Sequence, residues 1–209
     1  AYEIRLSLVG SEMCIRDSCK AERDDVQAAL MKWQAEAFET AAYAAGGVVA
    51  MMRSYQEWSA TPHARALAQL PLISIEKIGE AAPKPWPNGD RPLAGIRVLD
   101  LSRVIAGPVA GRTLAAHGAD VLLVSGPELP AIPWLSIDNG RGKLSCFIEL
   151  KSEAGRATMR ELLSQADIFS QGYRPRALAS LGFAPEDAAA LNPGIVYVTL
   201  SAYGNAGPW

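Results

Sequence analysis

Short apolar runs alternate with longer amphipathic stretches through the second half of the chain. The runs have the length and composition of strands buried on both faces of a parallel sheet. The predicted strands cover residues 96–101, 119–124, 144–150, 167–173 and 195–201. The stretches between them predict a proline-rich loop over 127–134 and helices over 152–165, 175–181 and 185–191. Strands that alternate with helices predict an α/β fold with a Rossmann-like, doubly wound parallel sheet.

The first of these strands opens a βαβ unit. A loop of small residues, Ala106-Gly107-Pro108, follows it and leads into an Ala- and Gly-rich helix. That helix should end at His117-Gly118, because glycine suits the left-handed position that terminates helices. The unit brings together a strand end, a glycine turn and a helix N-terminus, where α/β folds bind anionic ligands.

Residues 19–80 have a different pattern of apolar and polar positions, which predicts a small α+β segment. The expected elements are a helix from Asp24 or Asp25 to Gly46-Gly47, a strand over 48–52, helices starting at Ser54 and Thr61-Pro62, and an apolar strand over 72–78. Trp33 and Trp58 are expected in the core, and His63 on the surface of its helix. Residues 81–92 contain four prolines and predict an extended linker.

Bulk composition excludes several function classes. A formal net charge of −2 gives no basic footprint for nucleic acid. No apolar run approaches the roughly 20 residues that a membrane helix requires. The three cysteines lack metal-ligand spacing, and their odd number argues against a disulfide framework. We therefore expect a cytoplasmic protein that binds no metal, nucleic acid or membrane.

Other nucleotide-binding and hydrolytic signatures are missing. The turn Ala106–Gly111 is not the Gly-x-Gly-x-x-Gly fingerprint, and the second predicted strand runs into Ser125-Gly126 without the acidic residue that binds ribose. Gly142-Lys143 is followed by Leu144, so it is no P-loop. The Gly-x-Ser-x-Gly nucleophile elbow is also absent. These observations disfavour a dinucleotide-dependent oxidoreductase and an α/β-hydrolase.

Several short motifs occur in an order and at a spacing that resemble the class III CoA-transferases, the CaiB/BaiF family. They are Pro92–Val104 with Ala106-Gly107-Pro108, Gly140-Arg141-Gly142-Lys143, Ala166-Asp167-Ile168, Tyr173-Arg174-Pro175, Leu181-Gly182-Phe183, Asn192–Tyr197, Ser201–Gly204 and Gly207-Pro208-Trp209. The resemblance extends over residues 92–209. It implies a Rossmann-like CoA-binding domain over 93–209, with coenzyme A or acyl-CoA as substrate rather than as a permanently bound cofactor.

The same resemblance suggests a set of CoA-binding residues. Val104 and Ile105 would line the pocket near the thioester, while Lys143 and Tyr173 would contact CoA. From the residues themselves, Arg141 and Lys143 supply two cations on a backbone that a ligand can approach closely, and Arg174 sets a guanidinium beside the Tyr173 ring. Ordinary solvated charge is the alternative interpretation for Arg141, Lys143 and Arg174.

The chain departs from the family pattern at four positions. Gly172 stands where many members have Asn, and the family's basic residues fall at Gly126, Ser180 and, in some members, Ser201. Fewer cations would weaken the hold on CoA phosphates unless another copy or subunit supplies them.

The resemblance also implies a covalent mechanism. An Asp attacks the acyl-CoA thioester to form a mixed anhydride, the released CoA then forms an enzyme thioester, and a small carboxylic acid accepts the CoA. The catalytic Asp is expected beyond Trp209, and Asp138 is the one outside candidate within the chain. An α-methylacyl-CoA racemase-like enzyme and a non-catalytic CoA-binding or assembly half remain alternatives.

The arrangement of segments suggests a tandem protein. Residues 19–80 resemble the end of the family's smaller domain, yet they precede the CoA-binding domain. We expect the tail of one family copy, a linker and the start of a second copy, acting as a tandem pair or a homodimer. Residues 1–18 are expected to be non-native, because Glu12–Ser18 resembles the translation of a transposase end sequence used as a sequencing adapter.

Overall fold

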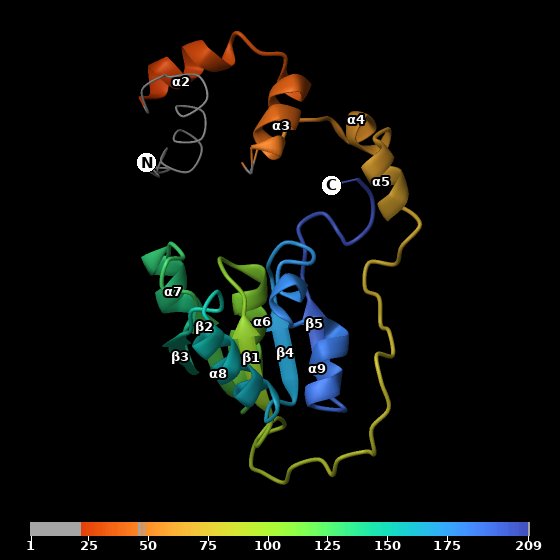
Figure 1. Cartoon of the computed structure of the whole chain (residues 1–209), viewed down its shortest axis with the longest axis vertical. Helices are drawn as coiled ribbons and strands as arrows, with labels where there is room; N and C mark the ends of the chain where they lie inside the picture. The colour runs from red at the N-terminus through yellow and green to blue at the C-terminus, as the bar shows by residue number, and fades with distance from the viewer. Residues whose placement is uncertain (1–21, 46, 48, 209) are drawn as a thin grey trace. The chain divides into compact units, whose positions relative to one another are not determined.

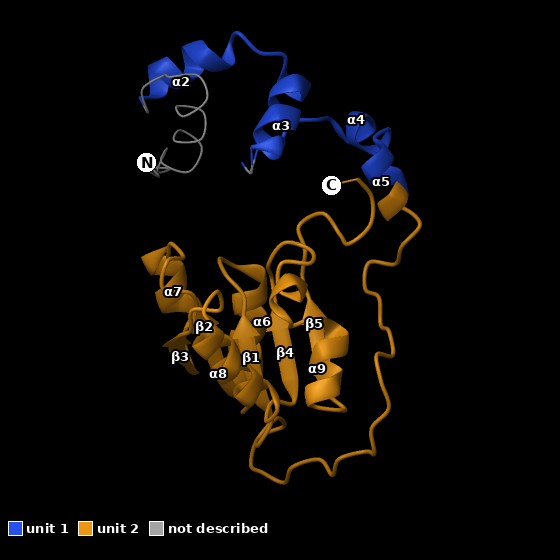
Figure 2. Cartoon of the chain, in the orientation of Figure 1, with its two compact units in different colours: residues 1–65 blue, residues 66–209 orange. Residues whose placement is uncertain are grey.

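The computed structural model describes residues 22–45, 47 and 49–208. The chain divides into two compact units, residues 1–65 and 66–209 (Figure 2). The predicted non-native segment, 1–18, lies outside the described residues. Each unit is described by itself below.

The described part of the first unit is helical. Its elements are α2 (Arg23–Leu30), α3 (Ala35–Ala44), α4 (Tyr55–Ser59) and the start of α5 (Pro62–Leu67). The single long helix predicted from Asp24 or Asp25 is therefore wrong: two helices form instead, because a turn lets Val26 and Ala29 bury against Phe38. Trp33 belongs to this cluster as predicted, with its ring 5.7 Å from that of Phe38.

The two helix starts predicted at Ser54 and Thr61-Pro62 are confirmed. The Ser54 hydroxyl accepts a hydrogen bond from the Glu57 backbone while the Glu57 carboxylate accepts one from Ser54, which completes a capping box. His63 was wrongly predicted to lie on the surface. Its side chain is fully buried, with the ring 5.9 Å from that of Trp58, because the short α5 turns this face inward.

The two strands predicted before residue 80 do not form. Residues 49–52 and 72–78 have no regular structure, and residue 48 lies outside the described residues. Leu72 and Ile75 are almost completely exposed. An apolar run becomes a strand only where a neighbouring strand pairs with its backbone and covers its side chains, and neither segment has such a neighbour among the described residues.

The second unit is built on a five-stranded, all-parallel sheet, as predicted (Figure 1). The strands are β1 (Arg97–Leu101), β2 (Asp120–Ser125), β3 (Lys143–Phe147), β4 (Ile168–Gln171) and β5 (Val196–Thr199). Their order is β3-β2-β1-β4-β5. Because β2 and β4 both flank β1, the chain reverses its direction across the sheet at β1.

Helices cover both faces of this sheet. On one face α6 (Ala106–Ala116) buries Ala115 against Val98 and Val121. On the other, α8 (Glu153–Leu163) and α9 (Pro185–Leu191) pack over Leu99 and Phe169. Gly118 follows α6 with φ +103°, which confirms the predicted glycine stop.

Two connections differ from the prediction. The loop expected over 127–134 gives way at its end to a helix, α7 (Pro133–Asn139), with Pro133 in the first turn where proline is favoured. The short helix expected over 175–181 is reduced to one 3₁₀ turn, η1 (Ala179–Leu181). The α7 helix leads directly into the Gly140–Lys143 segment, whose Arg141 and Lys143 are predicted to bind CoA.

Candidate functional site

The loops that follow β1 and β4 lie side by side at the point where the sheet changes direction. The Gly172 amide donates to the Leu101 carbonyl over 3.4 Å, and a Cβ on Gly172 would lie 3.7 Å from that of Ser102. Val104 and Ile105 are both more than half exposed here. In open α/β sheets this position, outside the carboxyl ends of the strands, is where ligands bind.

Tyr173 stands next to this loop pair. Its amide donates to Oε1 of Gln171 over 2.8 Å, which fixes the chain directly after β4. Burial raises the pKa of the Tyr173 hydroxyl, the nearby Arg103 charge opposes that rise, and Asp100 adds to it. The phenol is therefore neutral at physiological pH and lies within the field of an exposed guanidinium.

Arg103 was not singled out by the sequence analysis. Its guanidinium is bonded to the Pro130 carbonyl, and its side chain lies in the exposed part of the loop. The sequence feature that could have identified Arg103 as a candidate is its position immediately before Val104. Arg174, the predicted neighbour of the Tyr173 ring, is also exposed.

Lys143 is placed differently from what its predicted role suggests. Its ammonium lies 2.7 Å from Oδ2 of Asp100 and 2.8 Å from the Pro108 carbonyl, and the lysine and aspartate side chains are 1% and 0% exposed. The other Asp100 oxygen accepts hydrogen bonds from the backbone and hydroxyl of Ser102. Lys143 thus ties β3 to β1 and to the first turn of α6, and its predicted contact with CoA stays a prediction.

Two glycines of α6 make this network possible. A Cβ on Gly111 would lie 2.3 Å from Asp100 Oδ2 and 2.9 Å from Lys143 Nζ, so the ion pair occupies the space a side chain would need. A Cβ on Gly107 would likewise lie 2.3 Å from that of Ser102. These glycines let α6 lie directly on the end of β1.

The other cation of the Gly-Arg-Gly-Lys segment faces solvent. Arg141 is 74% exposed, with Nη2 3.8 Å from Oδ1 of Asp138. The second Asp138 oxygen pairs with Arg112 of α6 at 2.6 Å. Asp138, the outside candidate for a nucleophile, is therefore held between two guanidinium groups.

Asn139 links this segment to the β1 loop. Its side-chain amide donates to the Val104 carbonyl over 3.0 Å, and Asn139 is 4% exposed. Val104 itself has φ +70°, a left-handed conformation that a β-branched residue rarely adopts. The structure therefore brings Val104, Ile105 and the Gly140–Lys143 segment together on one side of β1, with Tyr173 and Arg174 following β4 on the other.

The four positions that depart from the family pattern divide into two groups. Gly126, Gly172 and Ser201 each follow a strand at its carboxyl end. Ser180 lies in η1, where its hydroxyl donates to the Ala177 carbonyl.

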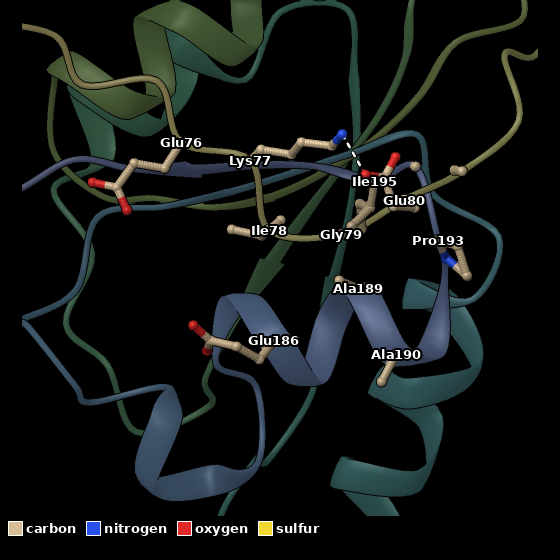
Figure 3. Close-up of a pocket in the computed structure, with 12 residues that line it drawn as sticks. Glu76, Lys77, Ile78, Gly79, Glu80, Glu186, Ala189, Ala190, Pro193 and Ile195 are labelled. Carbon is tan, nitrogen blue, oxygen red and sulfur yellow. Dashed lines mark ion pairs between the residues drawn. The ribbon is translucent and has the colours of Figure 1, made fainter.

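A cavity of about 410 Å³ lies elsewhere, between residues 76–81 and α9 (Figure 3). It is lined by Glu76, Glu80 and Glu186, and its one lysine, Lys77, pairs with Glu80 at 2.5 Å. Residues 193–195, which also line it, precede β5, so the cavity sits at the amino end of that strand. This acidic lining is unsuited to a polyanionic ligand.

Neither a metal centre nor a membrane span is found in the part of the chain that the structure describes. No group of three His, Cys, Asp or Glu side chains there could hold a metal ion. No described helix is both long and apolar enough to cross a bilayer.

Comparison with known proteins identifies the family. The sequence model of CoA-transferase family III matches residues 93–209, more than half of the chain. The chain belongs to this family. The match begins just before β1 and includes every loop of the site described above.

Several relatives bear the names of CoA transferases. The chain is 30% identical over 211 residues to the acetyl-coenzyme A transferase nodX of Hypoxylon pulicicidum, covering 93% of this chain and 35% of that protein. It is 36% identical over 141 residues to the succinate–glutarate CoA-transferase of Agrobacterium fabrum, covering 59% of this chain and 35% of that protein. The chain thus spans about a third of the length of these relatives.

Solved structures agree. The crystal structure of Rv3272 from Mycobacterium tuberculosis matches with a TM-score of 0.54 at 36% identity, over 58% of this chain and 36% of that one. A CaiB/BaiF family protein from Brucella suis matches with a TM-score of 0.54 at 30% identity, over 57% and 36%. The resemblance read from the short motifs is confirmed, as is the fold class.

Proposed function

We propose that residues 93–209 bind coenzyme A and acyl-CoA as part of an enzyme that transfers CoA to a small carboxylic acid. The proposal rests on one observation: the loops that follow β1 and β4 lie side by side at the point where the strand order of the sheet changes direction. Exposed apolar side chains at Val104 and Ile105 suit the acyl-thioester end of the ligand. Arg103, Arg141 and Arg174 supply exposed cations for the phosphates.

The chemistry proposed for the complete enzyme is nucleophilic. An Asp carboxylate attacks the thioester carbonyl and displaces CoA thiolate, giving a mixed anhydride. The thiolate then attacks the enzyme-derived carbonyl carbon, forming an enzyme thioester and releasing the acyl group as its acid. The acceptor carboxylate then attacks the enzyme thioester and displaces CoA thiolate, giving a second mixed anhydride. The thiolate attacks the acceptor-derived carbonyl carbon of that anhydride, so the acceptor leaves as its CoA thioester and the enzyme carboxylate is regenerated.

The nucleophile is proposed to lie beyond Trp209. Supporting this, Asp100 is buried in its ion pair and Asp138 is held between Arg112 and Arg141. Asp167 is also occupied, because its Oδ2 accepts a hydrogen bond from the Arg97 amide at 3.0 Å.

A tandem or dimeric arrangement is proposed for the same enzyme. Its support is that two fungal relatives, nodX and an acyl-CoA transferase of Gibberella moniliformis, match 93% and 87% of this chain. Matches of that extent continue upstream of residue 93, into the segment that resembles the end of the family's smaller domain.

Isothermal calorimetry on the full chain tests CoA binding. CoA should bind, and NAD should show no measurable heat, because no acidic side chain ends β2 to hold the ribose. Arg141→Ala should weaken CoA by about tenfold through a lost charge-assisted contact. Arg160→Ala, which changes a partly exposed arginine on α8 that pairs with Glu153, is the control and should leave CoA affinity unchanged. NAD binding without CoA binding would overturn the proposal.

A further inference from the structure

The loop after β1 contains a residue, Val104, whose backbone is strained although its side chain is not packed in the core. Val104 adopts φ +70° and is 52% exposed, so its side chain gains little from burial. Glycine would adopt this backbone without steric conflict. Strained backbone of this kind persists only where surrounding groups hold it, and such residues concentrate at functional sites.

One group is placed to hold it. The Asn139 side-chain amide donates to the Val104 carbonyl, and no other hydrogen bond of the Asn139 side chain is found among the described residues. Its Oδ1 is buried and accepts no hydrogen bond from the described residues. The bond to Val104 is therefore the interaction that explains why an amide side chain stands at this position. An apolar side chain would fill this space without leaving a buried acceptor unpaired.

The position of Asn139 is itself fixed by ion pairs of its neighbours in the chain. Asn139 is the last residue of α7, and its neighbour Asp138 is paired with Arg112 of α6 at 2.6 Å. Four residues later, Lys143 is bonded to Asp100 and to the Pro108 carbonyl. Both sides of Asn139 are therefore fixed to the elements that flank the β1 loop.

We propose that Asn139 is a positioning residue that holds the Val104 backbone in its left-handed conformation. The hydrogen bond directs Val104 and Ile105 outward, at the start of α6, into the space where the acyl-thioester end of CoA is proposed to lie. The backbone role stands on the structure alone, whereas the ligand role rests on the proposed function.

Hydrogen–deuterium exchange on the full chain tests the backbone role without any ligand. Asn139→Ala should speed exchange in peptides covering 103–109 by about tenfold, the amount expected from one lost hydrogen bond. Asn139→Asp, which replaces the donor with a carboxylate oxygen at similar size, should act in the same direction and serves if the alanine variant folds poorly. Asn192→Ala is the matched control, because Asn192 is also buried and donates to two backbone carbonyls, at Leu163 and Ala166.

A double-mutant cycle distinguishes the release of backbone strain at Val104 from a general loosening of the loop. In the Val104→Gly background, Asn139→Ala should change exchange over 103–109 by less than about threefold, since glycine needs no restraint there. An equal effect in both backgrounds, or no effect of Asn139→Ala at all, would overturn the proposal.

Calorimetry with CoA and acetyl-CoA then tests the ligand role. Asn139→Ala should weaken acetyl-CoA by about tenfold while Asn192→Ala leaves it unchanged. Faster exchange with unchanged affinity would keep the restraint on Val104 and remove its link to the ligand. If the unaltered chain binds neither compound, the proposed function fails while the exchange result still stands.

Discussion

The ammonium of Lys143 lies 2.7 Å from a carboxylate oxygen of Asp100, and both side chains are almost completely buried. The two residues come from β3 and β1, which are separated in the sheet by β2. The pair reaches across that middle strand on the face covered by α6, where the Gly111 backbone leaves space for it. It therefore joins the strand that carries the candidate site to the segment that follows α7.

Removing one partner of this pair should destabilise the protein strongly. Lys143→Ala leaves the Asp100 carboxylate buried without its counter-ion, and we expect a loss of about 3–5 kcal/mol in the free energy of unfolding. Urea denaturation followed by circular dichroism measures it. The double variant Asp100→Asn, Lys143→Met should lose less, since no buried charge is left unpaired. A Lys143→Ala variant of unchanged stability but weakened CoA affinity would instead support the direct ligand contact expected from the family resemblance.

Gly111→Ala should be destabilising, although alanine is usually the better helix former. In an ordinary helix interior the exchange would stabilise by about 0.5–1 kcal/mol. Here the added Cβ would lie 2.3 Å from Asp100 Oδ2, so we expect a net loss of about 1–3 kcal/mol from overpacking. Ala110→Gly, at an exposed neighbour in the same helix, is the control and should cost only the propensity difference. Greater stability in Gly111→Ala would show that the ion pair can move aside.

The sheet could be predicted from sequence because each strand carries its own local signal. The run Val121–Val124 is apolar over its whole length and Val98–Leu101 is apolar except at Asp100, and glycine or proline lies close to the runs on either side. The Asp100–Lys143 pair could not be predicted, because it joins residues 43 positions apart and depends on which strands become neighbours. Lys143 in isolation looks like a solvated cation beside a glycine turn.

The sequence-based prediction failed at positions where tertiary contacts, rather than the local sequence, determine the structure. The apolar residues over 72–78 resemble a strand, but no described strand pairs with them. His63 has no sequence feature that distinguishes a buried ring from an exposed one, and its burial depends on tertiary packing, which includes the Trp58 ring. The strain at Val104 was equally hidden, since valine is not a residue expected at positive φ.

Stability should fall at alkaline pH through Tyr197. Its hydroxyl donates to the Phe183 carbonyl at 2.8 Å, and burial, assisted by the charges of Glu186 and Asp187, raises the Tyr197 pKa to about 12. The phenol of an unfolded chain ionises near pH 10, at about its unperturbed pKa. The folded state's advantage is therefore complete below about pH 10 and is lost as the pH rises towards about 12.

Urea denaturation at a series of pH values measures this dependence. Tyr197→Phe should be less stable at neutral pH through the lost hydrogen bond, by about 1 kcal/mol, and should show a shallower decline above pH 10. Burial also raises the Tyr173 pKa, so a smaller slope should persist in the variant. An identical slope in both proteins would contradict the assignment to Tyr197.

No carboxylate of the described chain should become acylated, and Asp138 is the one that tests this most directly. A nucleophilic carboxylate needs an unshared oxygen aimed at the thioester carbonyl. The Asp138 oxygens face Arg112 at 2.6 Å and Arg141 at 3.8 Å, and both guanidinium groups stabilise the carboxylate in its ground state. We expect that incubation with succinyl-CoA followed by hydroxylamine yields no hydroxamate in peptides from residues 22–208.

Asp138→Asn sharpens that trapping experiment. The substitution keeps the side chain's shape and removes the carboxylate that would be acylated. If Asp138 were the nucleophile, the unaltered chain would carry a hydroxamate at that residue, and the asparagine variant would lose it. A longer natural chain that includes the residues after Trp209 should carry the adduct downstream of the Tyr203–Pro208 motif, with Asp138 unmodified. An adduct at Asp138 in either chain would move the catalytic centre to the end of α7.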